Sequence, residues 1–134
     1  MVKTKEMALK TTSLDQQESK AIEAFVGQLM EAFPTKIRLI ALYGSKSRQD
    51  STPDSDIDIL VLVSEEGRSL RREIIDIGSQ FSLEYDVLLS PHVIGEARFR
   101  QKRGFSYYRN VAQDAIQLTI QRGKLALSPG ISLV

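Results

Sequence analysis

Residues 43–63 read YGSKSRQDSTPDSDIDILVLV and contain the most informative pattern of the chain. A Gly-Ser pair, Gly44 and Ser45, stands ten residues before Asp56-Ile57-Asp58. The flanking apolar residues predict two strands, over 37–43 and 56–63, joined by a short helix at 45–50 and a loop. Because side chains alternate along a strand, Asp56 and Asp58 are expected on one face. The pattern therefore predicts a glycine turn beside paired carboxylates.

A third carboxylate, Asp86, lies in another alternating run, 81–89, which we interpret as a third strand. If that strand neighbours the second, Asp86 stands about 5 Å from one of the first two acids. Two unit charges 4 Å apart cost roughly 4 kcal/mol at an effective dielectric of 20. Protonation of one acid or a bound divalent metal would relieve this repulsion. The chain has no cysteine and one histidine, so oxygen ligands for Mg²⁺ or Mn²⁺ are favoured over a zinc site.

The turn offers groups that suit a phosphate. Gly44 has no Cβ, so an anion can approach its backbone closely. The hydroxyl of Ser45 can donate to a phosphate, and amides at a following helix start favour anionic oxygens. Lys46 and Arg48 can offset negative charge, although Arg48 could instead pair with a nearby loop aspartate. Acids and turn together indicate metal-dependent nucleotide chemistry.

The remaining elements follow from apolar spacing. A stripe from Ile22 to Phe33 predicts a helix that Ser13 or Asp15 caps and Pro34 ends. Further helices are expected over 65–79, from Pro91 to Arg100 and over 106–121. His92, next to Pro91, is expected at a helix start in a surface or capping role. The fold class predicted is α/β (α+β), a small mixed sheet with helices packed on one face.

The chain has 134 residues, a length typical of one domain, which we place at residues 13–124 between tails at 1–12 and 125–134. No apolar run is long enough for a membrane span or a signal peptide, so a cytoplasmic protein is expected. The net charge is +1, but residues 96–124 hold seven Lys or Arg against two acids. This segment is either a solvated surface or a patch for an anionic ligand or an acidic partner, and it is weak support for nucleic-acid binding.

The chain resembles the polymerase-β-like nucleotidyltransferase superfamily, and within it the minimal nucleotidyltransferase branch. The signature of that branch is Gly-Ser, ten residues and Asp-x-Asp, which Gly44, Ser45, Asp56 and Asp58 match in full. Other positions that fit the family are Arg48, Ser55 and Asp86. The resemblance covers residues 37–90 strongly and 105–122 less specifically. It implies the nucleotidyltransferase fold.

The resemblance also implies a reaction and its site. Asp56 and Asp58 would bind two metal ions, Mg²⁺ or Mn²⁺, and Asp86 would complete one metal site and orient or act as the base. Gly44 and Ser45 would hold the triphosphate of a nucleoside triphosphate. A nucleoside monophosphate, AMP from ATP, would pass to a hydroxyl with release of pyrophosphate.

Members of the minimal branch resemble antitoxins of HEPN-domain ribonucleases, so a HEPN-type toxin is the partner that the resemblance implies. In that reading the chain is a protein adenylyltransferase and supplies no acceptor domain of its own. Two alternatives stay open. One is a non-catalytic antitoxin that acts by contact through the basic segment. The other is a small-molecule nucleotidyltransferase, acting for example on aminoglycoside hydroxyls. Monomer, homodimer and hetero-oligomer are all compatible with the sequence.

Overall fold

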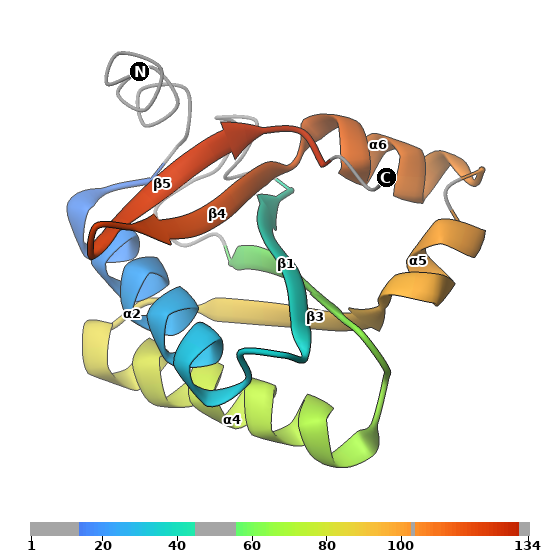
Figure 1. The fold of residues 1–134 in the computed structure, drawn as a ribbon. Helices are drawn as coiled ribbons and strands as arrows, with labels where there is room; N and C mark the ends of the chain where they lie inside the picture. Colours follow the sequence, from blue (N-terminus) through green and yellow to red (C-terminus); the bar gives the residue numbers. More distant parts are fainter. Residues whose placement is uncertain (1–13, 45–55, 103, 132–134) are drawn as a thin grey trace.

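A five-stranded sheet forms the centre of the computed structural model, which describes residues 14–44, 56–102 and 104–131 (Figure 1). The elements in chain order are α2 (Gln16–Ala32), β1 (Ile37–Tyr43), β2 (Ile57–Val63), α4 (Arg68–Tyr85), β3 (Leu89–Gly95), α5 (Glu96–Gln101), α6 (Ser106–Asp114), β4 (Ile116–Gln121) and β5 (Lys124–Pro129). In the described part of the chain, no helix is both long and apolar enough to span a bilayer.

The sheet is mixed, with strand order β3-β2-β1-β4-β5. β2 and β3 are parallel and are connected through α4, as a parallel pair requires. The pairs β1–β2, β1–β4 and β4–β5 are antiparallel. These observations confirm the predicted mixed α+β class.

Helices cover both faces of the sheet, which corrects the expectation of helices on one face (Figure 1). α2 and α4 pack on one face, where Phe25 and Ile74 meet Ile57 and Ile59 in the larger apolar cluster. On the other face, a smaller cluster joins Phe99 of α5 and Val111 of α6 to Leu60 of β2. Side chains alternate along β2, so this strand contributes to both apolar clusters. Asp58 lies on the same face of the strand as Leu60, the face that α5 and α6 cover.

The first helix agrees closely with the sequence. Asp15 caps α2 by accepting from the Glu18 backbone N–H at 2.8 Å, and the Glu18 carboxylate accepts from the Asp15 N–H at 3.0 Å. This reciprocal capping box satisfies two backbone donors at the helix start. The helix ends at Ala32, ahead of Pro34, as predicted. Met30, assigned to the apolar stripe, is instead 44% exposed.

The strand predicted at 81–89 is wrong, because residues 81–85 form the last turns of α4. The inward positions Leu70, Ile74, Ile77 and Phe81 follow one another at a spacing of three or four. This helical spacing extends into residues 81–85 and prevails over their apparent two-residue alternation. Leu83, expected on a buried strand face, is 86% exposed. The third strand is β3, which runs through Pro91 and replaces the helix predicted from there. Because β3 lies at the sheet edge, the missing proline N–H costs no ladder hydrogen bond.

The C-terminal region also differs from expectation. The helix predicted over 106–121 ends at Asp114, and β4 follows at once. Arg122 and Gly123, with φ of 55° and 77°, form a two-residue turn into β5. Two positive φ values in succession are the geometry of a hairpin turn that matches strand twist. Residues 125–127 are buried, so much of the predicted 125–134 tail belongs to the sheet.

Candidate active site

Gly44 lies against Asp58 at the end of β1. In the antiparallel β1–β2 register, Tyr43 is opposite Asp58, so the next residue after the strand turns over that carboxylate. Gly44 has a φ of +76°, and a Cβ built there would be 2.6 Å from Asp58 Oδ2. A side chain at position 44 would therefore be both strained and in collision with the acid. The predicted glycine turn beside a carboxylate is present.

The two acids of the Asp-x-Asp pattern are placed at the start of β2. Asp56 comes directly before the strand and is exposed, and Asp58 is its second residue. The Asp58 side chain is 30% exposed, so its oxygens reach solvent from a partly enclosed position. The other predicted nucleotide-binding residues, Ser45, Lys46, Arg48 and Ser55, lie outside the described residues. Their assignment stays a prediction.

Asp86 is not on a strand beside these acids. It is the C-cap of α4, with φ of 54° and ψ of 50°, and its N–H donates to the carbonyl oxygen of Ser82. Asp86 thus ends a helix in the left-handed conformation that aspartate tolerates better than most residues. Within residues 14–44, 56–102 and 104–131, no three His, Asp or Glu side chains form a group able to hold a metal. The expected cluster of three carboxylates is therefore absent from this part of the chain.

The side chains that do flank Asp58 on β3 are Ser90 and His92. In the parallel register, Ser90 is opposite Asp58 and His92 is opposite Leu60. His92 Nε2 is 3.5 Å from Asp58 Oδ1 and 3.4 Å from Ser90 Oγ. The His92 ring also packs edge-on against the Tyr43 ring, with centroids 5.5 Å apart. The expected role of His92 at a helix start is wrong, since it lies within a strand next to the acid.

A cavity of about 450 Å³ opens at this point. Its lining residues are Tyr43, Gly44, Asp58, His92, Asn110, Val111 and Asp114. α6 thus contributes an amide and a second carboxylate, which can hydrogen-bond the sugar or base of a nucleotide. Asn110 and Asp114 were not expected at the site from the sequence, although their spacing of four places them on one helix face. We call this space the catalytic cavity.

The donor set at the catalytic cavity fits one kind of metal site. Mg²⁺ is usually held by one or two carboxylates, with phosphate oxygens and waters completing the octahedron. Asp56 and Asp58 supply such carboxylates at the start of β2, and Asp58 lines the cavity together with Gly44. The residues therefore suit a divalent ion that arrives with a triphosphate, and they do not form an all-protein cage.

Comparison with known proteins identifies the family of the chain. The chain belongs to the nucleotidyltransferase domain family, whose model matches residues 22–118. Its place is in the minimal branch of that family, and it is a nucleotidyltransferase enzyme.

Curated relatives come from Methanocaldococcus jannaschii. The chain is 36% identical over 97 residues to the candidate protein adenylyltransferase MJ0604, covering 72% of this chain and 93% of the relative. It is 37% identical over 71 residues to the candidate protein adenylyltransferase MJ0141, covering 52% and 72%.

Two solved structures are similar at lower identity. A mutant of the toxin–antitoxin pair MntA–HpeT matches with a TM-score of 0.49 and 21% identity, covering 71% of this chain and 70% of that one. A candidate nucleotidyltransferase from Sulfolobus solfataricus matches with a TM-score of 0.47 and 18% identity, covering 96% and 92%.

Proposed function

We propose that this enzyme transfers AMP from ATP to a hydroxyl group of a protein partner. The observation that carries the proposal is the placement of Gly44 directly against the Asp58 carboxylate, where a Cβ would come within 2.6 Å of Oδ2, in a cavity that both residues line. The relative that shares 36% identity and is covered over 93% of its length is itself named for protein adenylylation, which supports a protein acceptor.

The residues of the catalytic cavity have distinct roles in this reaction. Gly44 lets the triphosphate approach the backbone, and Asp56 and Asp58 hold Mg²⁺ or Mn²⁺. When bound, the metal neutralises phosphate charge and favours the ionised acceptor oxygen. The acceptor hydroxyl gives its proton to water, its oxygen forms a bond to the α-phosphorus, and the bond from that phosphorus to the departing pyrophosphate breaks. Positioning and charge neutralisation supply most of the rate in such in-line transfers.

Residues between β1 and β2 in the sequence complete the proposal. Ser45, Arg48 and Ser55 match positions of the family pattern, Lys46 adds a positive charge in the same segment, and we assign all four to nucleotide binding. Asn110 and Asp114 of α6 line the catalytic cavity together with Asp58. We assign these two residues to the ribose or the base, because an amide and a carboxylate can read hydroxyl and amino groups.

The partner we propose is a HEPN-type toxin, so the enzyme would be the antitoxin of a two-component pair. This step depends on the match of Gly44, Ser45, Asp56 and Asp58 to the minimal signature. Adenylylation of the toxin would block its action by covalent modification. Contact alone is the alternative mechanism, and the experiment below separates the two.

The test is transfer of label from α-³²P-ATP, with Mg²⁺, to a purified HEPN-type protein. Wild type should label the partner, and Asp58→Asn should reduce labelling by at least about 100-fold, since it removes a carboxylate from the reacting centre. The matched control is Glu84→Gln, which likewise converts a carboxylate to an amide, at an exposed position of α4, and should keep wild-type labelling. Absence of label with wild type, or equal labelling by Asp58→Asn, contradicts the proposal. Full neutralisation of the toxin by Asp58→Asn would favour contact alone.

A further inference from the structure

A second cavity, of about 330 Å³, adjoins the catalytic cavity. The two share Tyr43, His92 and Val111 as lining residues, so they meet where the His92 ring stands next to Asp58. From this junction the second cavity extends along β3 toward Arg71 and Ile75 of α4 and Arg98 of α5. A molecule bound there can therefore reach the reacting end of the catalytic cavity.

The walls of the second cavity are apolar and aromatic. Phe99 and Tyr108 pack edge to face with centroids 5.8 Å apart, and Ile75 contributes an apolar side chain that is 41% exposed. Its described lining includes no carboxylate and no side-chain amide, in contrast to Asp58, Asn110 and Asp114 of the catalytic cavity. The two cavities thus differ in chemistry: one suits a nucleotide, and the other suits an apolar side chain.

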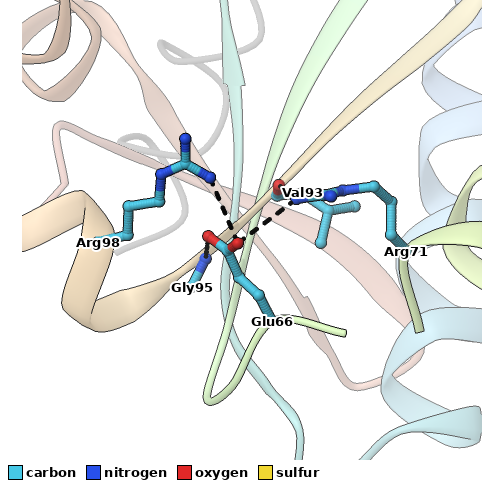
Figure 2. Close-up of polar contacts among 5 residues, drawn as sticks. All are labelled: Glu66, Arg71, Val93, Gly95 and Arg98. Atoms are coloured by element: carbon cyan, nitrogen blue, oxygen red, sulfur yellow. Dashed lines mark hydrogen bonds and ion pairs between the residues drawn. The ribbon is translucent and has the colours of Figure 1, made fainter. Parts of the chain in front are cut away.

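The rim of the second cavity is positively charged. Arg71 and Arg98 approach the Glu66 carboxylate from α4 and from α5, at 3.7 and 3.4 Å (Figure 2). The backbone N–H of Gly95 also donates to Glu66, at 2.8 Å. The arginine side chains are 43% and 54% exposed, whereas that of Glu66 is only 29% exposed. Because the two exposed arginines share one less exposed carboxylate, this cluster has a net positive charge at the surface.

A second cluster of the same kind continues this surface. Arg38 and Arg100 both lie within 4 Å of Glu96, at 3.9 and 3.6 Å, and Lys102 stands 5.7 Å from the centre of the Tyr108 ring. Together the two clusters bring five basic side chains against two carboxylates. The acids of α4 nearby, Glu73 and Asp76, line neither cavity. Complementary charge of this size favours an acidic partner.

The free edge of β3 beside the second cavity is closed to strand addition. Ser82 Oγ accepts from the Leu89 N–H, Arg71 donates to the Val93 carbonyl oxygen, and Glu66 accepts from the Gly95 N–H. Pro91, between them, has no N–H to offer. Such blocking devices are how sheet edges avoid pairing with other chains. A partner must then contact this region through side chains rather than by extending the sheet.

We propose that the second cavity, with its basic rim, is the docking site for the acceptor protein. It takes a segment of the partner in which an apolar side chain enters between Ile75 and Phe99 and flanking Asp or Glu residues meet Arg71 and Arg98. The acceptor hydroxyl then lies past His92, at the catalytic cavity. This inference rests on the proposed function, because it identifies where the partner of that reaction binds.

The first test is site-specific photocrosslinking with the purified HEPN-type protein. The photoreactive amino acid p-benzoyl-phenylalanine replaces either Ile75, which lines the second cavity, or Arg72, which is exposed next to the cavity-lining Arg71 on the same helix. Crosslinking from position 75 and not from position 72 is expected. A complex that forms but crosslinks from position 72 alone, or from neither position, overturns the proposal. Crosslinking needs no transfer, so a crosslink at position 75 without labelling would contradict the proposed reaction and not the docking site.

The second test compares Arg98→Gln with Arg72→Gln, both of which remove one positive charge. Arg98→Gln should raise the KM for the partner by about fivefold, the effect of losing a partly exposed ion pair, and should lessen its salt dependence. The Kd for ATP and kcat should stay within about twofold of wild type, and Arg72→Gln should change none of these three constants. A loss of ATP affinity in Arg98→Gln would instead place the nucleotide base in the second cavity. That result, or an unchanged KM for the partner, overturns the proposal.

Discussion

The Nε2 atom of His92 lies 3.5 Å from Oδ1 of Asp58. The two residues come from adjacent parallel strands, and the imidazole separates the catalytic cavity from the second cavity. His92 can therefore orient the Asp58 carboxylate and limit how an acceptor approaches it. We expect both effects to depend on the ring nitrogen and on the size of the ring.

The first prediction concerns His92. His92→Ala should lower the single-turnover rate of AMP transfer by about 10- to 100-fold, the usual effect of removing a group that orients a metal-binding carboxylate. His92→Gln, which keeps a donor at similar reach, should recover part of this loss. Since the side chain is 50% exposed, the melting temperature should change little. Equal rates for wild type and His92→Ala would show that Asp58 needs no such neighbour.

The second prediction concerns Gly44. Gly44→Ala places a Cβ 2.6 Å from Asp58 Oδ2 at a φ of +76°, so it should displace the carboxylate and strain the turn. We expect the free energy of unfolding to fall by about 1–2 kcal/mol. The rate of AMP transfer should fall by more than this loss of stability explains. The control is Gly27→Ala in α2, where no atom lies within 4 Å of the added Cβ. That change should raise stability by up to about 1 kcal/mol, because alanine favours a helix.

The third prediction concerns Glu66 and pH. The hydrogen bond from the Gly95 N–H, opposed by burial and aided by Arg98 and Arg71, lowers the pKa of Glu66 below 4.5. A carboxyl group whose pKa is lowered on folding stabilises the protein above its unfolded pKa and ceases to do so as pH falls through the folded pKa. Glu66→Gln should therefore cost about 1 kcal/mol in urea unfolding at pH 7.

The same comparison at pH 3 should show a smaller difference, because a lowered pKa contributes less stability as pH falls below the unfolded pKa of the group. Glu84→Gln, at an exposed position of α4, should have little effect at either pH. A cost of Glu66→Gln that is constant from pH 3 to pH 7 would contradict the assigned cause.

The fourth prediction concerns β5. Leu127 is 4% exposed in the apolar cluster beneath α2 and α4, so Leu127→Ala should reduce the free energy of unfolding by about 2–3 kcal/mol. Ser128→Ala, at the exposed neighbouring position, should change it by less than about 0.5 kcal/mol. Thermal or urea unfolding measures both. Equal stability of the two variants would mean that this segment is a tail after all.

The sequence was most informative where neighbouring residues determine structure. Gly44 and Asp58 could be paired in advance because a strand, a loop and a second strand follow one another with clear signals. Asp86 could not be placed, because Phe81, Leu83 and Tyr85 alternate as in a strand while Phe81 also continues the helical stripe from Leu70. Only packing against the sheet decides between the two periods.

His92 was misplaced for a different reason. Its position next to Asp58 depends on the register between β2 and β3, and no local pattern encodes the pairing of distant strands. The hairpin from Ile116 to Pro129 did carry a local signal. Ile116, Leu118 and Ile120 alternate, and Arg122-Gly123 is a suitable turn, but the spacing of Tyr108, Val111 and Ala115 favoured extending the helix across it.

The pairing of Tyr43 with Asp58 also bears on misfolding, because it belongs to the register between β1 and β2. If β2 slipped by one residue against β1, every side chain of the strand would change faces. Asp58 would then enter the apolar layer beneath α2 and α4, and Ile57 would take its place in the cavity. A misaligned molecule would carry a buried unpaired charge as well as an inert site. The cost of burying that charge therefore disfavours the same register in which the site could not function. The interactions that stabilise the core also determine the register of the active site.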